Sequence, residues 1–132
     1  MYYTPFQNLY IGGMALIVAV CGLPGSGKSY FAARLAERLD AIYLSSDRIR
    51  REMFTHRTYS DAEKRDVYHE MIRRAREFPS RSVVFDATFY RRDIRMLFEE
   101  AFPDVTWIEV TADAKVIRTR LAMPRTDSEA DR

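Results

Sequence analysis

A glycine-rich stretch at residues 22–29, GLPGSGKS, carries the clearest chemical signal in the sequence. It matches the pattern G-x-x-x-x-G-K-[ST], with an apolar run at 14–21 before it and a helical pattern at 28–39 after it. Glycines at this spacing let the backbone bend so that successive N–H groups converge on phosphate oxygens, and the helix N-terminus adds positive potential. The sequence therefore predicts a phosphate-binding loop between a strand and a helix.

The residue types in this loop predict contacts with a nucleoside triphosphate and its metal ion. We expect the Lys28 ammonium to reach the β and γ phosphates and stabilise charge during transfer, and the Ser29 hydroxyl to ligate Mg²⁺. ATP and Mg²⁺ are therefore the predicted cofactors. The predicted nucleotide-binding residues are Gly22, Leu23, Pro24, Gly25, Ser26, Gly27, Lys28, Ser29 and Tyr30.

Asp47 is the candidate base for an acceptor hydroxyl. It follows a second strand-like run, AIYLS at 41–45, so we expect it at the carboxyl edge of the sheet, where open α/β folds bind ligands. The alternative is that Asp47 only N-caps the helix predicted over 47–54. Arg50 lies one helical turn further along and is a candidate for holding an acceptor phosphate, with a solvated arginine as the alternative.

Asp86 is the second metal candidate, because it ends a strand-like run, SVVFDA at 82–87. Its carboxylate is expected to hold Mg²⁺ through water, and the alternative is a buried carboxylate that caps the next turn. Thr88 is a candidate hydrogen-bond partner for the acceptor or the loop. In the following helix, Arg92 and Arg95 are candidates for lining an acceptor pocket, with solvated arginines as the alternative.

These residues are separated by an alternation of strand and helix patterns. The strand patterns lie at 14–21, 41–45, 82–87 and 105–110. The helical patterns lie at 28–39, 47–54, 61–78, 91–102 and 112–122. Such alternation predicts βαβ units, and hence an α/β fold with a parallel sheet between layers of helices. The loop at 22–29 resembles that of P-loop NTPases, and this resemblance implies their three-layer sandwich with strand order 2-3-1-4.

Composition narrows the class of protein further. The chain has 132 residues, with 21 Lys and Arg against 19 Asp and Glu, for a net charge of +2. This length suits a single domain, and the balanced charge gives no support to a nucleic-acid partner while leaving one open. One cysteine, Cys21, cannot form an internal disulfide, and the longest apolar run is too short to span a membrane. We expect a cytoplasmic protein without a membrane partner.

The two ends of the chain depart from this pattern. Residues 1–13 have no clear periodicity, so we expect an N-terminal extension or an artificial leader, with an aromatic arm on the sheet edge as the alternative. A single phosphate-loop domain is predicted over 14–132. No fifth strand pattern follows the last helical one, which leaves open that the domain is incomplete at its C-terminus.

Motifs that are missing from the sequence separate the classes of phosphate-loop protein. A GTPase needs an N-K-x-D motif after a later strand, and the sequence has none. A motor or AAA+ ATPase has an acidic pair at the end of an acidic strand, whereas Asp86 is followed by Ala87. A small kinase, which needs a base for its acceptor and cations for the transferred charge, fits better.

The order of GLPGSGKS, SSDRIR, VVFDATF and the tail RTRLAMPRTDSEAD resembles that of the AAA-type P-loop kinases. This group is related to polynucleotide 5′-hydroxyl kinase, zeta toxin and chloramphenicol phosphotransferase, and the resemblance covers about 14–132. It implies that Asp47 activates the acceptor hydroxyl and that Arg50 contacts an acceptor phosphate. It also implies a lid arginine, for which Arg120 and Arg125 are the candidates. The relatives continue into a further helix and a closing strand that this sequence lacks.

We therefore predict an ATP-dependent kinase that transfers the γ-phosphoryl group to a hydroxyl acceptor. The predicted acceptor is a polynucleotide 5′-OH, a nucleotide or a small metabolite, and no motif in the sequence distinguishes these three classes. The predicted catalytic residues are Lys28, Asp47, Arg120 and Arg125. The alternative function is a nucleotide-binding regulatory or interaction module with little or no catalysis.

Overall fold

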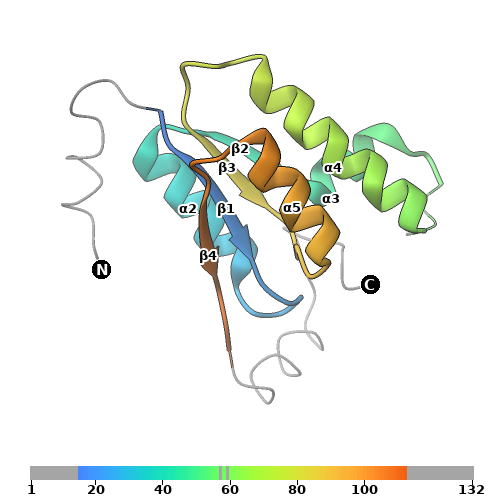
Figure 1. The fold of residues 1–132 in the computed structure, drawn as a ribbon. Helices are drawn as coiled ribbons and strands as arrows, with labels where there is room; N and C mark the ends of the chain where they lie inside the picture. Colours follow the sequence, from blue (N-terminus) through green and yellow to red (C-terminus); the bar gives the residue numbers. More distant parts are fainter. Residues whose placement is uncertain (1–14, 57, 59, 113–132) are drawn as a thin grey trace.

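The computed structural model of the chain describes residues 15–56, 58 and 60–112, and Figure 1 shows its fold. The strands are β1 (Ile17–Cys21), β2 (Ile42–Ser45), β3 (Val83–Asp86) and β4 (Thr106–Glu109). The helices are α2 (Lys28–Leu39), α3 (Ser46–Met53), α4 (Asp61–Arg76) and α5 (Arg92–Ala101). The predictions for residues 1–13 and for nearly all of the helix at 112–122 lie outside the described residues.

The strands form one parallel sheet in the order β2-β3-β1-β4, which confirms the predicted order and the α/β class. The central pair, β3 and β1, brings Asp86 level with Val20, and β2 brings Ser45 level with Asp86 on the other side. Because all strands point the same way, the polar residues that follow them collect at one edge of the sheet.

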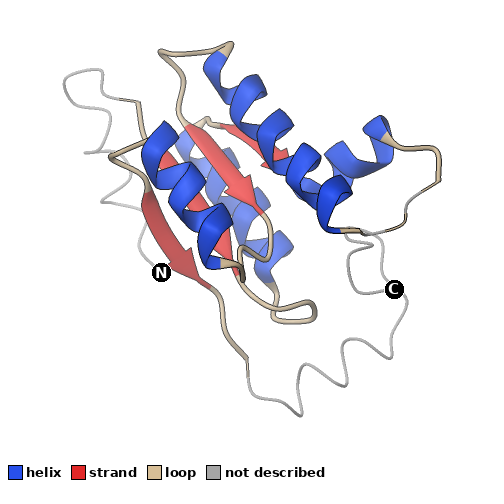
Figure 2. Cartoon of the chain, turned by 45° about the vertical axis from the view of Figure 1, so that its right-hand side comes forward, coloured by secondary structure: helices blue, strands red, loops and turns tan. Residues whose placement is uncertain are grey.

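Helices cover both faces of the sheet, as Figure 2 shows, and this confirms the expected helix layers. Side chains alternate between the faces along each strand. On β1, Val18 and Val20 pack with the apolar residues of α2, whereas Ala19 packs in the cluster that contains the apolar residues of α4 and α5. None of the described helices is both long and apolar enough to cross a membrane.

Serine side chains fix where α3 and α4 begin. Ser60 Oγ accepts a hydrogen bond from the backbone N–H of Glu63 at 3.2 Å, as the S-x-x-E pattern of a capping box requires. The cap of α3 is Ser45, whose Oγ accepts from the N–H of Arg48 at 3.4 Å. Asp47 therefore lies inside the first turn of α3, and the alternative that it N-caps this helix is wrong.

An aromatic cluster fills the core between the sheet, α4 and α5. Phe98 of α5 is fully buried. Its ring packs edge-on against the rings of Phe85 and Phe89, with 4.9 Å between ring centroids in each case. The centroid of the Tyr68 ring of α4 lies 5.9 Å from that of Phe98, and the centroid of the Trp107 ring of β4 lies 5.1 Å from that of Phe89. Phe98 therefore connects both helices of this face to the strands beneath them.

Replacing Phe98 is expected to weaken the whole fold. Phe98→Ala should lower the free energy of unfolding by about 3–5 kcal/mol, because it removes a buried ring and leaves a cavity. Urea unfolding followed by circular dichroism measures the change. Phe78→Ala is the matched control, since Phe78 is 47% exposed, and it should change stability by less than about 0.5 kcal/mol. Equal losses in the two variants would contradict this description of the core.

Candidate functional site

The predicted phosphate-binding loop joins β1 to α2 through backbone conformations that favour glycine. Gly22 has φ 154°, and Gly25 and Gly27 have φ 84° and 95°. A Cβ atom on Gly22 would lie 2.6 Å from the carbonyl oxygen of Val110 and 2.9 Å from Ser26 Oγ. The loop therefore packs so tightly against the segment after β4 that only glycine fits at position 22.

The loop also has hydrogen-bonding groups that no described residue satisfies. Helix α2 begins at Lys28 with no side-chain cap and no acidic residue in its first turn, so its first N–H groups lack acceptors within the helix. Ser26 Oγ is buried and has no hydrogen-bond partner among the described residues. Phosphate oxygens would accept from these groups, so the residues present fit the phosphates of a nucleotide.

Lys28 and Asp86 form a buried ion pair beside the loop. The distance from Lys28 Nζ to Asp86 Oδ1 is 3.0 Å, and the two residues are 6% and 1% exposed. The Tyr43 hydroxyl donates a hydrogen bond to the other carboxylate oxygen, Asp86 Oδ2. Both oxygens of a carboxylate that is almost inaccessible to water therefore have a partner, which offsets the cost of burying its charge.

Tyr43, which was not among the predicted site residues, lies on β2 two residues before Ser45. Period-2 alternation puts Tyr43 and Ser45 on one face, and the register puts Ser45 beside Asp86. Burial, followed by the charge of Asp86, raises the pKa of Tyr43, so the hydroxyl stays protonated and remains a donor. The Arg48 guanidinium lies 5.0 Å from the centre of its ring.

A second buried network connects α3 to α4. Arg50 Nη1 lies 3.2 Å from Asp47 Oδ1, and Arg50 Nε lies 3.6 Å from Glu63 Oε1. All three residues are 5% exposed. Glu63 Oε2 also accepts hydrogen bonds from the N–H and the hydroxyl of Thr58, at 2.9 and 3.0 Å. The predicted base and the predicted acceptor-binding arginine are thus in contact, and Glu63, which was not among the predicted site residues, helps to hold the arginine.

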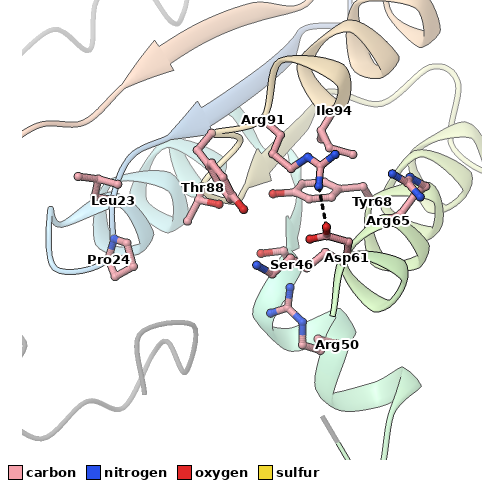
Figure 3. A pocket seen from close by; sticks show the side chains of 12 residues that line it. Leu23, Pro24, Ser46, Arg50, Asp61, Arg65, Tyr68, Thr88, Arg91 and Ile94 are labelled. Atoms are coloured by element: carbon pink, nitrogen blue, oxygen red, sulfur yellow. Dashed lines mark ion pairs between the residues drawn. The ribbon is translucent and has the colours of Figure 1, made fainter. Parts of the chain in front are cut away.

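A cavity of about 560 Å³ lies between the phosphate-binding loop and helices α3, α4 and α5 (Figure 3). Its lining residues are Leu23, Pro24, Ser46, Arg50, Asp61, Lys64, Arg65, Tyr68, Thr88, Tyr90, Arg91 and Ile94. Arg91 Nη1 and Asp61 Oδ2 are 3.2 Å apart, so an ion pair joins the starts of α5 and α4 at this cavity. Its volume is within the range of small-molecule sites, about 300–1,000 Å³.

Most of the predicted site residues within the described ranges lie around this loop and cavity. Arg50 and Thr88 line the cavity, whereas Asp47 is not among the lining residues and contacts Arg50 directly. Arg92 is exposed and is not among the lining residues, although its neighbour Arg91 is. Leu23 and Pro24 of the loop line this cavity as well, so the loop and the cavity share a wall.

The remaining predicted residues are placed differently. Ser29 lies in the first turn of α2 and is partly buried, and Tyr30 is 64% exposed. Arg95 donates hydrogen bonds to backbone carbonyls and is not among the lining residues. The candidate lid residues Arg120 and Arg125 lie outside the described residues.

Solved structures with similar folds include several kinases. A chain of the Pnkp1/Rnl/Hen1 complex matches with a TM-score of 0.69 and 17% identity, covering 86% of this chain and 41% of its own length. A sugar kinase from Janibacter sp. HTCC2649 matches with a TM-score of 0.68 and 20% identity, covering 89% of this chain and 72% of its own. A gluconokinase from Sinorhizobium meliloti 1021 matches with a TM-score of 0.66 and 20% identity, covering 89% of this chain and 69% of its own.

These likenesses show a shared fold at low identity, and the chain spans less than half of the Pnkp1/Rnl/Hen1 chain that it matches. No curated protein sequence matches the chain. The model of one protein family, described as an AAA domain, matches residues 17–132. Since that match covers most of the sequence and includes the phosphate-binding loop, the chain belongs to this AAA domain family and has the fold of the P-loop kinases.

Proposed function

We propose that the protein binds ATP with Mg²⁺ in the phosphate-binding loop and transfers the γ-phosphoryl group to a hydroxyl acceptor in the adjoining cavity. The observation that carries this proposal is the shared wall between the two, formed by Leu23 and Pro24. An acceptor in the cavity would lie beside the terminal phosphate, and proximity is the main contribution of a protein to phosphoryl transfer.

In this proposal Lys28 has two alternative partners, the Asp86 carboxylate and the phosphates of the nucleotide. Lys28 Nζ lies 3.0 Å from Asp86 Oδ1 and neutralises this carboxylate. With a triphosphate bound, the same ammonium would turn to the β and γ phosphates, where it stabilises the charge that develops during transfer. Asp86 would then keep its hydrogen bond from Tyr43 and present its other oxygen toward the loop.

Ser29 and Asp86 are the residues that we assign to Mg²⁺. Both offer oxygen atoms, which Mg²⁺ prefers, and the hydrogen bond from Tyr43 would still hold Asp86 once Lys28 turns to the phosphates. When bound, the metal ion neutralises charge on the β and γ phosphate oxygens. This chain's contribution is to fix where the ligand oxygens lie and to exclude water from the buried side of the carboxylate.

Asp47 is the base in this proposal. Its carboxylate accepts the proton from the acceptor hydroxyl as a bond forms between that oxygen and the γ-phosphorus. The bond between the γ-phosphorus and the β–γ bridging oxygen breaks, and ADP leaves with the electron pair. Arg50, 3.2 Å from Asp47, fixes the orientation of the carboxylate, and Glu63 fixes Arg50 in turn. A lid arginine at Arg120 or Arg125 remains a prediction.

Removing Lys28 tests nucleotide binding. Lys28→Ala should weaken ATP binding about 10- to 100-fold, which is the usual cost of losing a hydrogen bond to a charged group. Isothermal titration calorimetry with ATP and Mg²⁺ measures it. Because this variant leaves the Asp86 charge buried and unpaired, Lys28→Met/Asp86→Asn is the second variant, which removes both charges. Unchanged affinity in that folded double variant would contradict nucleotide binding in the loop.

Removing the base tests transfer separately from binding. Asp47→Asn should lower acceptor-dependent ADP formation by about 10²- to 10⁴-fold while leaving ATP affinity unchanged. The assay uses nucleosides, nucleoside monophosphates, gluconate and a 5′-hydroxyl oligonucleotide as acceptors. Asp104→Asn, an exposed carboxylate in the turn after α5, is the matched control. Normal turnover in Asp47→Asn removes this residue from the mechanism, and no acceptor-dependent ADP in the wild type favours a nucleotide-binding module instead.

Removing the Tyr43 hydroxyl tests how Asp86 is held. Tyr43→Phe should reduce the gain in ADP affinity that Mg²⁺ produces by about 10-fold, because residues that orient a metal ligand commonly contribute this much. Calorimetry of ADP with and without Mg²⁺ measures the gain. Tyr68→Phe removes a buried hydroxyl from the opposite side of the sheet and should leave the gain unchanged. The assignment of Asp86 to the metal is wrong if both variants keep the full gain.

A further inference from the structure

The segment after β3 contains a backbone conformation that bulky residues avoid. Phe89 has φ 51°, in the left-handed region, and its side chain is 1% exposed. For a large aromatic residue this conformation costs free energy, and it persists only where the surroundings fix it. Such positions concentrate at functional sites, and the residues on both sides of Phe89, Thr88 and Tyr90, line the cavity.

Several contacts hold this segment in its strained conformation. One nitrogen of Arg95, Nη1, donates to the carbonyl oxygens of Phe89 and Tyr90 at 2.7 and 2.8 Å. The N–H of Phe89 donates to the Tyr68 hydroxyl at 3.3 Å. The Phe89 ring packs edge-on against Phe98 at 4.9 Å. Arg95 is therefore a positioning residue, and the turn at Phe89 is fixed on both its backbone and its side chain.

The result of this turn is an aromatic ring presented to the cavity. Tyr90 is 59% exposed, although the aromatic core formed by Phe89 and Phe98 begins one residue away. Tyrosine rings usually bury most of their apolar surface. The exposed position of the Tyr90 ring is fixed by the strained backbone at Phe89 and by the hydrogen bonds from Arg95 to the carbonyl oxygens of Phe89 and Tyr90, which indicates a function for this ring. A flat ligand ring that stacks on Tyr90 would supply it.

The charges around Tyr90 indicate a second feature of the ligand. Lys64 Nζ lies 5.7 Å from the centre of the Tyr90 ring and also lines the cavity. The other cavity cations have carboxylates nearby, with Arg91 at 3.2 Å from Asp61 and Arg65 at 3.9 Å from Asp93. Among the described residues, no carboxylate lies within ion-pair distance of Lys64. Its charge is therefore available for an anionic group.

We propose that the acceptor is a small molecule that combines a flat aromatic ring, stacked on Tyr90, with an anionic group bound by Lys64. A nucleoside monophosphate with a free hydroxyl has this chemistry. The inference rests on the proposed function, because it identifies the cavity as the acceptor site. It favours this class over non-aromatic sugars and sugar acids, which have no ring to stack on Tyr90.

Ligands that carry the two features separately test the proposal. Calorimetry on the full chain, loaded with Mg²⁺ and a non-hydrolysable ATP analogue, compares guanosine 3′-monophosphate, guanosine, ribose 5-phosphate and ribose. We expect guanosine 3′-monophosphate to bind most tightly, and loss of either the ring or the phosphate to weaken binding about 5- to 100-fold. Equal affinity for ribose 5-phosphate and guanosine 3′-monophosphate overturns the proposal.

Two variants assign each feature to its residue. Tyr90→Ala should remove the advantage of guanosine 3′-monophosphate over ribose 5-phosphate, and Lys64→Gln should remove its advantage over guanosine. Phe78→Ala, an exposed aromatic two residues after α4, and Arg73→Gln, an exposed cation on α4, are the matched controls and should change neither ratio. The proposal is overturned if either site variant behaves like its control.

The outcome separates this inference from the proposed function. If guanosine 3′-monophosphate binds as expected but no phosphoryl group is transferred to it or to any other acceptor, the ligand class stands and the kinase activity fails. If ADP forms with gluconate or ribose and not with guanosine 3′-monophosphate, the kinase activity stands and the ligand class is wrong.

Discussion

The buried ion pair between Lys28 and Asp86 is the interaction on which the rest of the site depends. It exists because β3 lies directly beside β1, so the end of β3 meets the loop that follows β1. Neither charge is stable at this depth without the other, or without a bound group that replaces it. A triphosphate that takes over Lys28 must therefore leave Asp86 with another partner, and the hydrogen bond from Tyr43 is already in place. The loop, the strand order and the polar edge of the sheet are parts of one electrostatic arrangement.

The cavity beside this ion pair is shaped by a different constraint. Its walls come from helices that begin at the same edge of the sheet, and their starts are joined by Arg91 and Asp61. The network of Asp47, Arg50 and Glu63 fixes one part of the wall, and the strained turn at Phe89 fixes another. Glu63 also holds the N–H and hydroxyl of Thr58, so the segment between α3 and α4 is attached to the same network. Polar groups that are buried and paired in this way keep a single geometry.

Much of the architecture could be predicted from local patterns. The glycine spacing and the Lys–Ser pair identify the phosphate-binding loop, because its backbone geometry depends on consecutive residues. Strand and helix periods predicted the first and last residues of the described elements to within three positions. The alternation predicted a parallel sheet, and the structure confirms that sheet and its predicted strand order. The location of Arg50 and Thr88 at this edge was also predictable, since residues that follow parallel strands collect there, whereas their roles remain predictions.

Contacts between distant segments were decided only by the tertiary structure. Tyr43 reaches a carboxylate 43 residues away, and the predicted strand order alone does not say which side chain its hydroxyl meets. The sequence motif explains Glu63 as a helix cap, whereas its contact with Arg50 depends on how α4 packs on α3. The turn at Phe89 has no local signal at all, because the core and Arg95 impose it against the intrinsic preference of the residue. Local patterns therefore determine which elements form, and packing determines which side chains meet.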